Sequence, residues 1–288
     1  MDKPVRERIS LIVDSCCDLT PEMKERFRPA VAPLKVRVDG GAEYIDDGTA
    51  DVPALIADMA RSKQGASSSC PSTEEYAEPM READECFVVT LSSKLSGSYN
   101  AARVAAEMVM EDAPEKKIHV FDSESASAGE VQLALFLRDR IDEGLSFEEI
   151  IPLADEYIAQ MRTLFVLEDL GNFVKNGRLS KVSGLLASVL SLCPIMGDNG
   201  HGDIHLVAKA RGIQNSLRKL VEIVAEMTAD ATEKSVRMVL AFCNCPSRAQ
   251  TLKASLLEKC RALSEIILVP TGALSTMYAN DGGVILAF

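Results

Sequence analysis

The sequence predicts an α/β protein, because short apolar segments with the character of buried strands alternate with segments that have helical apolar spacing. Three of the apolar segments end in polar residues, which is typical of parallel strands whose carboxyl ends form a binding edge. A chain of 288 residues is long enough for two domains. We therefore expect a parallel-sheet N-terminal domain over residues 1–162 and a mixed-sheet C-terminal domain over residues 163–288.

The alternation of strands and helices is regular in the N-terminal half. The expected strands lie at residues 9–15, 30–40, 85–93 and 117–125. Side chains able to cap a first helical turn mark where three of the intervening helices begin: Thr20, Asp51 and Ser146. Because Glu149 follows Ser146 by three residues, a capping box is predicted there.

The C-terminal half is less regular and predicts a mixed sheet. A strand and a short helix precede a turn at Gly177–Arg178. Residues 183–197 are strongly apolar and predict a helix that leads into a strand, and residues 197–211 predict a hairpin around a glycine-rich turn. The remaining expected strands lie at residues 235–245, 265–271 and 282–288, with amphipathic helices at 215–231 and 247–260.

Charge and composition limit the partners and the compartment. Forty-three acidic against 31 basic residues give a net charge of −12, which disfavours nucleic acid as a partner. The charged N-terminus does not resemble a secretory signal, and no apolar run approaches the roughly 20 residues of a membrane span. Eight scattered cysteines without a CxxC pair fit a reduced compartment. We therefore expect a cytoplasmic protein.

Polar pairs follow three of the expected parallel strands, at Asp14–Ser15, Ser92–Ser93 and Asp122–Ser123. The carboxyl ends of parallel strands meet at one edge of a sheet, where ligands bind. Asp14 and Asp122 could serve there as a Mg²⁺ or acid–base pair of a small-molecule transferase. Alternatively, each carboxylate could anchor a loop by accepting backbone N–H groups, which is the interpretation that we favour.

Several short motifs occur in the order and rough spacing of DegV family proteins, which the sequence resembles over nearly its whole length. The motifs are Leu11–Ser15, Ser67–Ser72, Ser92–Tyr99, Val120–Ser123, Gly177–Ser180 and Lys209–Arg211. The resemblance implies two α/β domains with a lipid tunnel between them. It also implies a binding subunit that holds a long-chain fatty acid and presents its carboxylate to a separate fatty acid kinase for acyl-phosphate formation.

The resemblance implies no cofactor besides the bound fatty acid, and transient contact with a membrane is consistent with it. The chain contains neither GxxxxGK[ST] nor a GxGxxG after an expected strand, so we do not expect an ATP site of its own or an enzyme. A lipid sensor without kinase coupling is an alternative.

The family likeness assigns the carboxylate-binding role to Ser68 and to the loop at Ser96 and Gly97. Tyr278 stands where family members usually have a histidine that reaches the carboxylate, and a phenol donates a hydrogen bond but carries no positive charge. From the residues alone, Ser96 or Ser98 could instead cap the helix that follows, and the two roles are compatible because helix N-termini bind anions.

Two basic positions match the family positions implicated in phosphotransfer or in docking of the kinase, Arg178 and Arg211. Both arginines could instead form structural salt bridges in so acidic a chain. Two further positions depart from the family pattern: Cys70 replaces the usual glutamine, and Asn176 replaces the first of two glycines before Arg178.

Overall fold

A parallel sheet forms the centre of the N-terminal half in the computed structural model, which describes residues 9–63, 65–179 and 192–288. Its strand order is β2-β1-β6-β7, and all neighbours are parallel. The strands are β1 (Ile9–Asp14), β2 (Ala30–Ala32), β6 (Glu85–Thr90) and β7 (Lys117–Asp122). We call this sheet A. It confirms the parallel sheet predicted from the sequence.

Helices cover both faces of sheet A, which explains why its strands are almost continuously apolar. One face packs on α4 (Thr73–Glu82) and α5 (Ser98–Asp112). The other face packs on α2 (Pro21–Phe27), α6 (Ala128–Asp142) and α7 (Phe147–Gln160). Adjacent residues of β1 point to opposite faces, so Ile12 contacts the first layer while Leu11 and Val13 contact the second.

A small antiparallel sheet, which we call sheet B, follows β2. Its order is β4-β3-β5, with β3 (Lys35–Val38), β4 (Glu43–Ile45) and β5 (Ala66–Ser69), and it packs near α3 (Val52–Arg61). The prediction of a single extended stretch over residues 30–40 is therefore wrong. It is two strands in two sheets, because the chain breaks at Pro33, which has no N–H to continue a ladder.

A six-stranded mixed sheet, sheet C, forms the C-terminal half in the order β10-β9-β8-β13-β11-β12, with only β11 and β12 parallel. Its strands are β8 (Thr163–Val166), β9 (Ile195–Asp198), β10 (Ile204–Ala208), β11 (Val236–Phe242), β12 (Leu263–Pro270) and β13 (Val284–Ala287). The helices within the described part of this half are α8 (Gly171–Lys175), α10 (Ile213–Met227), α11 (Pro246–Lys259) and α12 (Ala273–Ala279). The predicted hairpin is β9 and β10.

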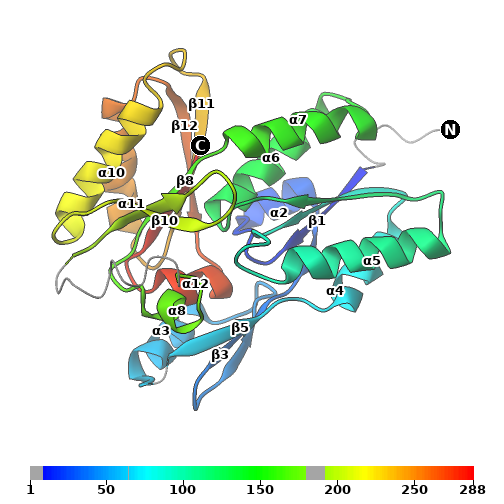
Figure 1. The fold of residues 1–288 in the computed structure, drawn as a ribbon, viewed down its shortest axis with the longest axis horizontal. Coiled ribbons are helices and arrows are strands. Elements are labelled where there is room, and N and C mark those ends of the chain that lie inside the picture. The colour runs from blue at the N-terminus through cyan, green and yellow to red at the C-terminus, as the bar shows by residue number, and fades with distance from the viewer. Residues whose placement is uncertain (1–8, 64, 180–191) are drawn as a thin grey trace.

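The helices α6 and α7 lie between sheets A and C, whereas α10 and α11 cover the outer face of sheet C (Figure 1). Residues of β11 and β13 therefore share one apolar core with α6. β8 begins at Thr163, the first residue of the predicted second domain, and the division into two domains stays a prediction.

The predicted helix starts at Thr20, Asp51 and Ser146 are confirmed, including the Ser146–Glu149 capping box. The helix expected within residues 183–197 lies largely outside the described residues, as does Ser180. Within the described ranges, every helix is too short or too polar to cross a bilayer.

Two buried carboxylates from the N-terminal half hold the first turn of α12. Asp18 Oδ1 accepts the amide of Gly272 at 2.7 Å. The two oxygens of Asp46 accept the amides of Ala273 and Leu274, at 2.8 and 3.0 Å. These bonds satisfy amides that the start of a helix leaves without intrahelical partners. α12 lies in the C-terminal half of the chain and packs on α3 and β3 as well as on α8, so the two carboxylates add to the contacts that join the halves of the molecule.

Asp18 gives the fold a testable pH dependence, because burial raises the pKa of its carboxyl group to about 7. The folded state keeps this proton up to about pH 7, whereas the unfolded chain releases it near pH 3.8, the ordinary pKa of an aspartate. Wild-type stability therefore falls as pH rises through this window. Asp18→Asn removes the titrating group. We therefore expect the free energy of unfolding of the variant, relative to that of wild type, to be higher at about pH 8.5 than at about pH 5.5.

Urea denaturation followed by circular dichroism measures this difference at the two pH values. Asp112→Asn, which removes an exposed carboxylate at the end of α5, is the matched control. An equal stability difference between Asp18→Asn and wild type at both pH values would contradict a raised pKa for Asp18.

Candidate functional site

A cavity of about 300 Å³ lies where the loops after the strands of sheet A meet sheet C and α12. This volume lies at the lower end of the range for small-molecule sites. Its wall is mostly apolar and comes from both halves of the chain. The larger apolar side chains of the wall are Leu34, Leu91, Leu95, Phe165, Leu167, Phe173, Leu274 and Ile285.

Five of the six site residues predicted from the sequence line this cavity: Ser68, Ser96, Gly97, Arg178 and Tyr278. They come from β5, the loop before α5, the turn after α8, and α12. The hydroxyl oxygens of Ser68 and Tyr278 lie 3.5 Å apart. We call Ser68, Ser96, Gly97 and Tyr278 the polar end of the cavity.

The polar end is also where the cavity approaches the surface. An open pocket of about 490 Å³ adjoins it and shares Ser96, Gly97 and Arg178 with the cavity. The exposed residues Ser93 and Lys94 line the outer part of this pocket. A ligand group held at the polar end therefore lies beside an opening that a second molecule can reach.

The start of α5 gives the polar end its backbone donors. Gly97 is the N-cap of α5, so the alternative in which Ser96 or Ser98 caps this helix is wrong. The Ser96 hydroxyl instead accepts the Ser98 amide at 3.2 Å. Among the described residues the Gly97 amide donates to no acceptor. Because α5 is 15 residues long, its N-terminus favours an anion here.

A side chain at Gly97 would crowd Cys70. A methyl group at its Cα would lie 3.3 Å from Cys70 Sγ, which is closer than most carbon contacts. Cys70 therefore packs against the loop and also lines the cavity. Because Gly97 has no side chain, its backbone amide and the Cys70 thiol can lie close together at the polar end.

Tyr278 lies on α12 with its ring packed on Phe173, at a centroid distance of 4.6 Å. The side chain is half-buried and faces the cavity. Its hydroxyl is thus placed to donate one hydrogen bond at the polar end, without the positive charge that a histidinium would add.

The two predicted arginines have different surroundings. Arg178 donates to the carbonyls of Leu95 and Asn176, at 3.0 and 2.5 Å, and within the described chain it pairs with these carbonyls rather than with a carboxylate. Arg211 is exposed just before α10, does not line the cavity, and pairs through its backbone with Leu192. The docking role of Arg211 stays a prediction.

Asp14 and Asp122 anchor loops, as we favoured. The oxygens of Asp14 accept the amides of Cys16 and Leu91, at 3.0 and 2.9 Å. Asp122 Oδ1 accepts the amides of Ser93 and Glu124, at 3.0 and 3.1 Å. The two carboxylates lie at the ends of β1 and β7, which are separated by β6, so they do not form a pair.

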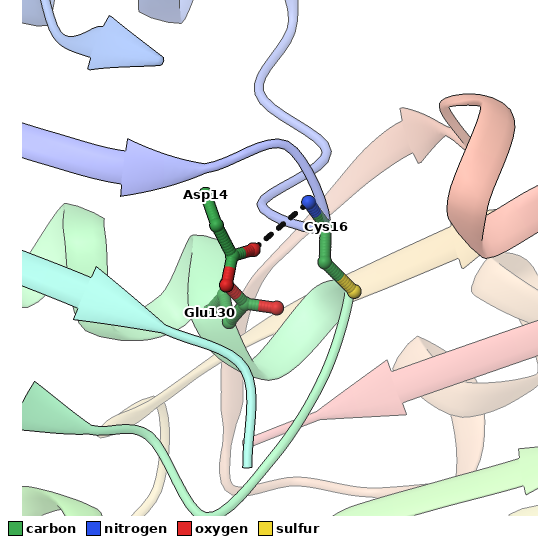
Figure 2. A group of neighbouring side chains, drawn as sticks. All are labelled: Asp14, Cys16 and Glu130. Carbon is green, nitrogen blue, oxygen red and sulfur yellow. Dashed lines mark hydrogen bonds between the residues drawn. The ribbon is translucent and has the colours of Figure 1, made fainter. Parts of the chain in front are cut away.

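Asp14 instead has two other neighbours, Cys16 and Glu130, which lie beside it as Figure 2 shows. One atom from each of the three side chains lies within 4.8 Å of the others, and all three residues are buried. This donor set does not fit Mg²⁺, which prefers six oxygen ligands and not a thiol. The transferase interpretation of Asp14 therefore lacks support.

Protonation of Glu130 explains how the carboxyl groups of Asp14 and Glu130 can lie side by side in a buried site. Burial raises the pKa of Asp14 to about 6, and burial together with the charge of Asp14 raises the pKa of Glu130 well above its ordinary value. Hydrogen bonding with the Glu130 side chain helps Asp14 to keep its charge. Because Asp14 accepts two amides, it keeps the charge while Glu130 keeps its proton near neutral pH.

Sequence reasoning missed the loop before α6 as a wall of the cavity. Glu124 and Ser127 line it with φ values of 51° and 54°, a region that few residues other than glycine adopt. The Ser127 hydroxyl donates to Asp18 Oδ2 at 2.6 Å, so the carboxylate that holds α12 also holds this loop. The run of serines after β7 was the signal available in the sequence.

Comparisons with known proteins agree with these features. The model of the DegV family, described as an uncharacterised protein family, matches residues 8–288. A DegV domain-containing protein of Streptococcus pneumoniae strain R6 is 34% identical over 283 residues, which cover 96% of this chain and 98% of that protein.

Solved structures of DegV proteins share the whole fold. A DegV family protein from Ruminococcus gnavus with vaccenic acid has a TM-score of 0.92 and 38% identity, covering 98% of this chain and 99% of that chain. The fatty acid kinase B3 protein of S. pneumoniae, loaded with linoleic acid, has a TM-score of 0.88 and 32% identity, covering 97% and 98%. The sequence match over residues 8–288 and these shared folds show that the chain belongs to the DegV family.

Proposed function

We propose that this protein binds one long-chain fatty acid in the cavity and presents its carboxylate to a separate fatty acid kinase, which forms an acyl phosphate with ATP. The observation that carries the proposal is a mostly apolar cavity in which the hydroxyls of Ser68 and Tyr278 lie 3.5 Å apart and which shares Ser96, Gly97 and Arg178 with a pocket open to the surface. Relatives of the same fold hold vaccenic and linoleic acid. Burial of each methylene contributes about 0.8 kcal/mol, so an acyl chain suits the apolar wall.

The polar end is the expected place for the carboxylate. The hydroxyls of Ser68, Ser96 and Tyr278 and the amide of Gly97 can donate to it, and each donor to a charged group contributes about 1.5 to 3 kcal/mol. Glu124, Asp198 and Asp203 also line the cavity, and Asp203 lines the outer pocket together with Arg178. Repulsion from the carboxylates of Glu124 and Asp198 disfavours a head group beside those two residues.

The kinase role rests on the opening and on Arg178, which lines both the cavity and the outer pocket. A kinase that docks over this opening would reach a carboxylate at the polar end. Exposed Arg211 is the proposed second docking residue. In this proposal the chain is a binding subunit without its own ATP site, it acts in the cytoplasm, and it contacts a membrane only transiently to exchange its ligand.

A lipid sensor without kinase coupling is the second candidate. Tyr278 favours it, because the phenol offers the carboxylate no positive charge where family members usually have a histidine. Both candidates require the same bound fatty acid. They differ in whether an acyl phosphate is formed.

The fatty acid itself is the first prediction of the proposal. We expect protein purified from bacteria to show one bound long-chain fatty acid in native mass spectrometry, identified after extraction. Ala126→Trp should abolish the bound lipid, because Ala126 lines the cavity and the indole fills it. Val104→Trp adds the same ring to an exposed site on α5 and should retain the lipid. Recovery of no fatty acid from folded wild-type protein would refute the proposal.

Kinase coupling is a separate prediction. With ATP and a bacterial fatty acid kinase, we expect loaded wild-type protein to yield an acyl phosphate, trapped by hydroxylamine as a hydroxamate. Arg178→Ala should lower this rate about tenfold, which corresponds to about 1.4 kcal/mol. Arg218→Ala, an exposed change on α10, should leave it unchanged. If wild type binds lipid but forms no product and Tyr278→His does, the sensor candidate is favoured.

A further inference from the structure

We propose that Asn172 is a positioning residue of the polar end, which holds the strand of Ser68 and the helix of Tyr278 at a fixed separation. The inference rests on the proposed function, because it concerns recognition of the ligand carboxylate. Asn172 does not line the cavity and is not expected to touch the ligand. Its effect would pass through the backbone segments that it binds.

The buried side chain of Asn172 bridges two segments that are far apart in the sequence. Its Oδ1 accepts the amide of Ala66 at 3.3 Å, and its Nδ2 donates to the carbonyl of Met277 at 2.7 Å. Ala66 precedes Ser68 by two residues on β5, so the two side chains share a face of that strand. Met277 directly precedes Tyr278 on α12. One amide group therefore sets the distance between two predicted carboxylate donors.

The position of β5 explains why a side chain is needed here. β5 is an edge strand of sheet B, so its outer backbone groups have no partner strand. Asn172 takes the amide of Ala66, and Asn176 Nδ2 donates to the carbonyl of Ala66 at 2.9 Å. The two asparagine side chains therefore make the hydrogen bonds to Ala66 that a neighbouring strand would otherwise make.

The same short segment fixes the turn that carries Arg178. Asn176 Nδ2 also donates to the carbonyl of Asn172 at 2.8 Å, and the carbonyl of Asn176 accepts a bond from Arg178 at 2.5 Å. The Asn176 side chain therefore adds a contact between the arginine turn and β5 that a glycine at this position could not make.

Positioning of this kind predicts a selective defect. Hydrogen bonds to a carboxylate weaken steeply when donors move by a fraction of an ångström, whereas burial of an acyl chain tolerates such shifts. Loss of the Asn172 bridge should therefore weaken binding of a fatty acid more than binding of its methyl ester, which has the same chain and no carboxylate.

The test measures the affinities of delipidated full-length protein for oleic acid and methyl oleate, by displacement of a fluorescent fatty alcohol. We expect Asn172→Ala to lower the ratio of acid affinity to ester affinity at least about fivefold, the effect of one weakened charge-assisted hydrogen bond. Asn176→Gly should lower the ratio in the same direction, and it covers the case in which Asn172→Ala does not fold. Asn215→Ala is the matched control, because Asn215 donates to the Arg211 carbonyl at 2.8 Å on exposed α10.

Equal weakening of acid and ester in a folded Asn172 or Asn176 variant, or an unchanged ratio, would overturn the positioning role and leave the proposed function standing. A wild-type protein that binds neither ligand would overturn the proposed function, and the inference with it. The two failures are therefore distinguishable.

Discussion

The structure depends on the hydrogen bonds that the buried carboxylates of Asp18 and Asp46 accept from the first turn of α12. α12 has only seven residues, too few to be stable alone, and it carries Tyr278 to the cavity. Burial raises the pKa of both carboxyl groups, so the contact costs desolvation free energy that the amide bonds offset only in part. Because this contact holds α12 in place, residues from both halves of the chain form the wall of the cavity.

The cavity combines two kinds of side chain. Sheet C, α12 and the loops after sheet A supply its apolar wall, whereas Ser68 of β5, the loop at Ser96 and Gly97, and Tyr278 of α12 supply the donors. Such a division suits a ligand with a long apolar chain and one charged group, because the chain needs only shape and the charge needs directed bonds. Burial together with the charge of Asp14 raises the pKa of Glu130, which disfavours a second negative charge beside Asp14.

Local features were predictable from the sequence. The caps at Thr20, Asp51 and Ser146 depend on residues within one helical turn, and the strand ends of sheet A follow from apolar runs that stop at polar residues. The resemblance to the family identified five residues that line one cavity. What could not be predicted depends on contacts between distant segments. The bonds from Asp46 to α12 and the bridge from Ala66 to Met277 through Asn172 have no local pattern, whereas Pro33 was a local signal of the strand break that our prediction overlooked.

The most direct measurement of the central claim is a crystal structure of the protein with the lipid that copurifies with it. The account predicts a carboxylate oxygen within about 3 Å of Ser96 Oγ or the Gly97 amide, with the acyl chain running along Phe165, Leu167 and Ile285. An acyl chain elsewhere on the molecule, or a carboxylate at the opposite end of the cavity, would contradict it.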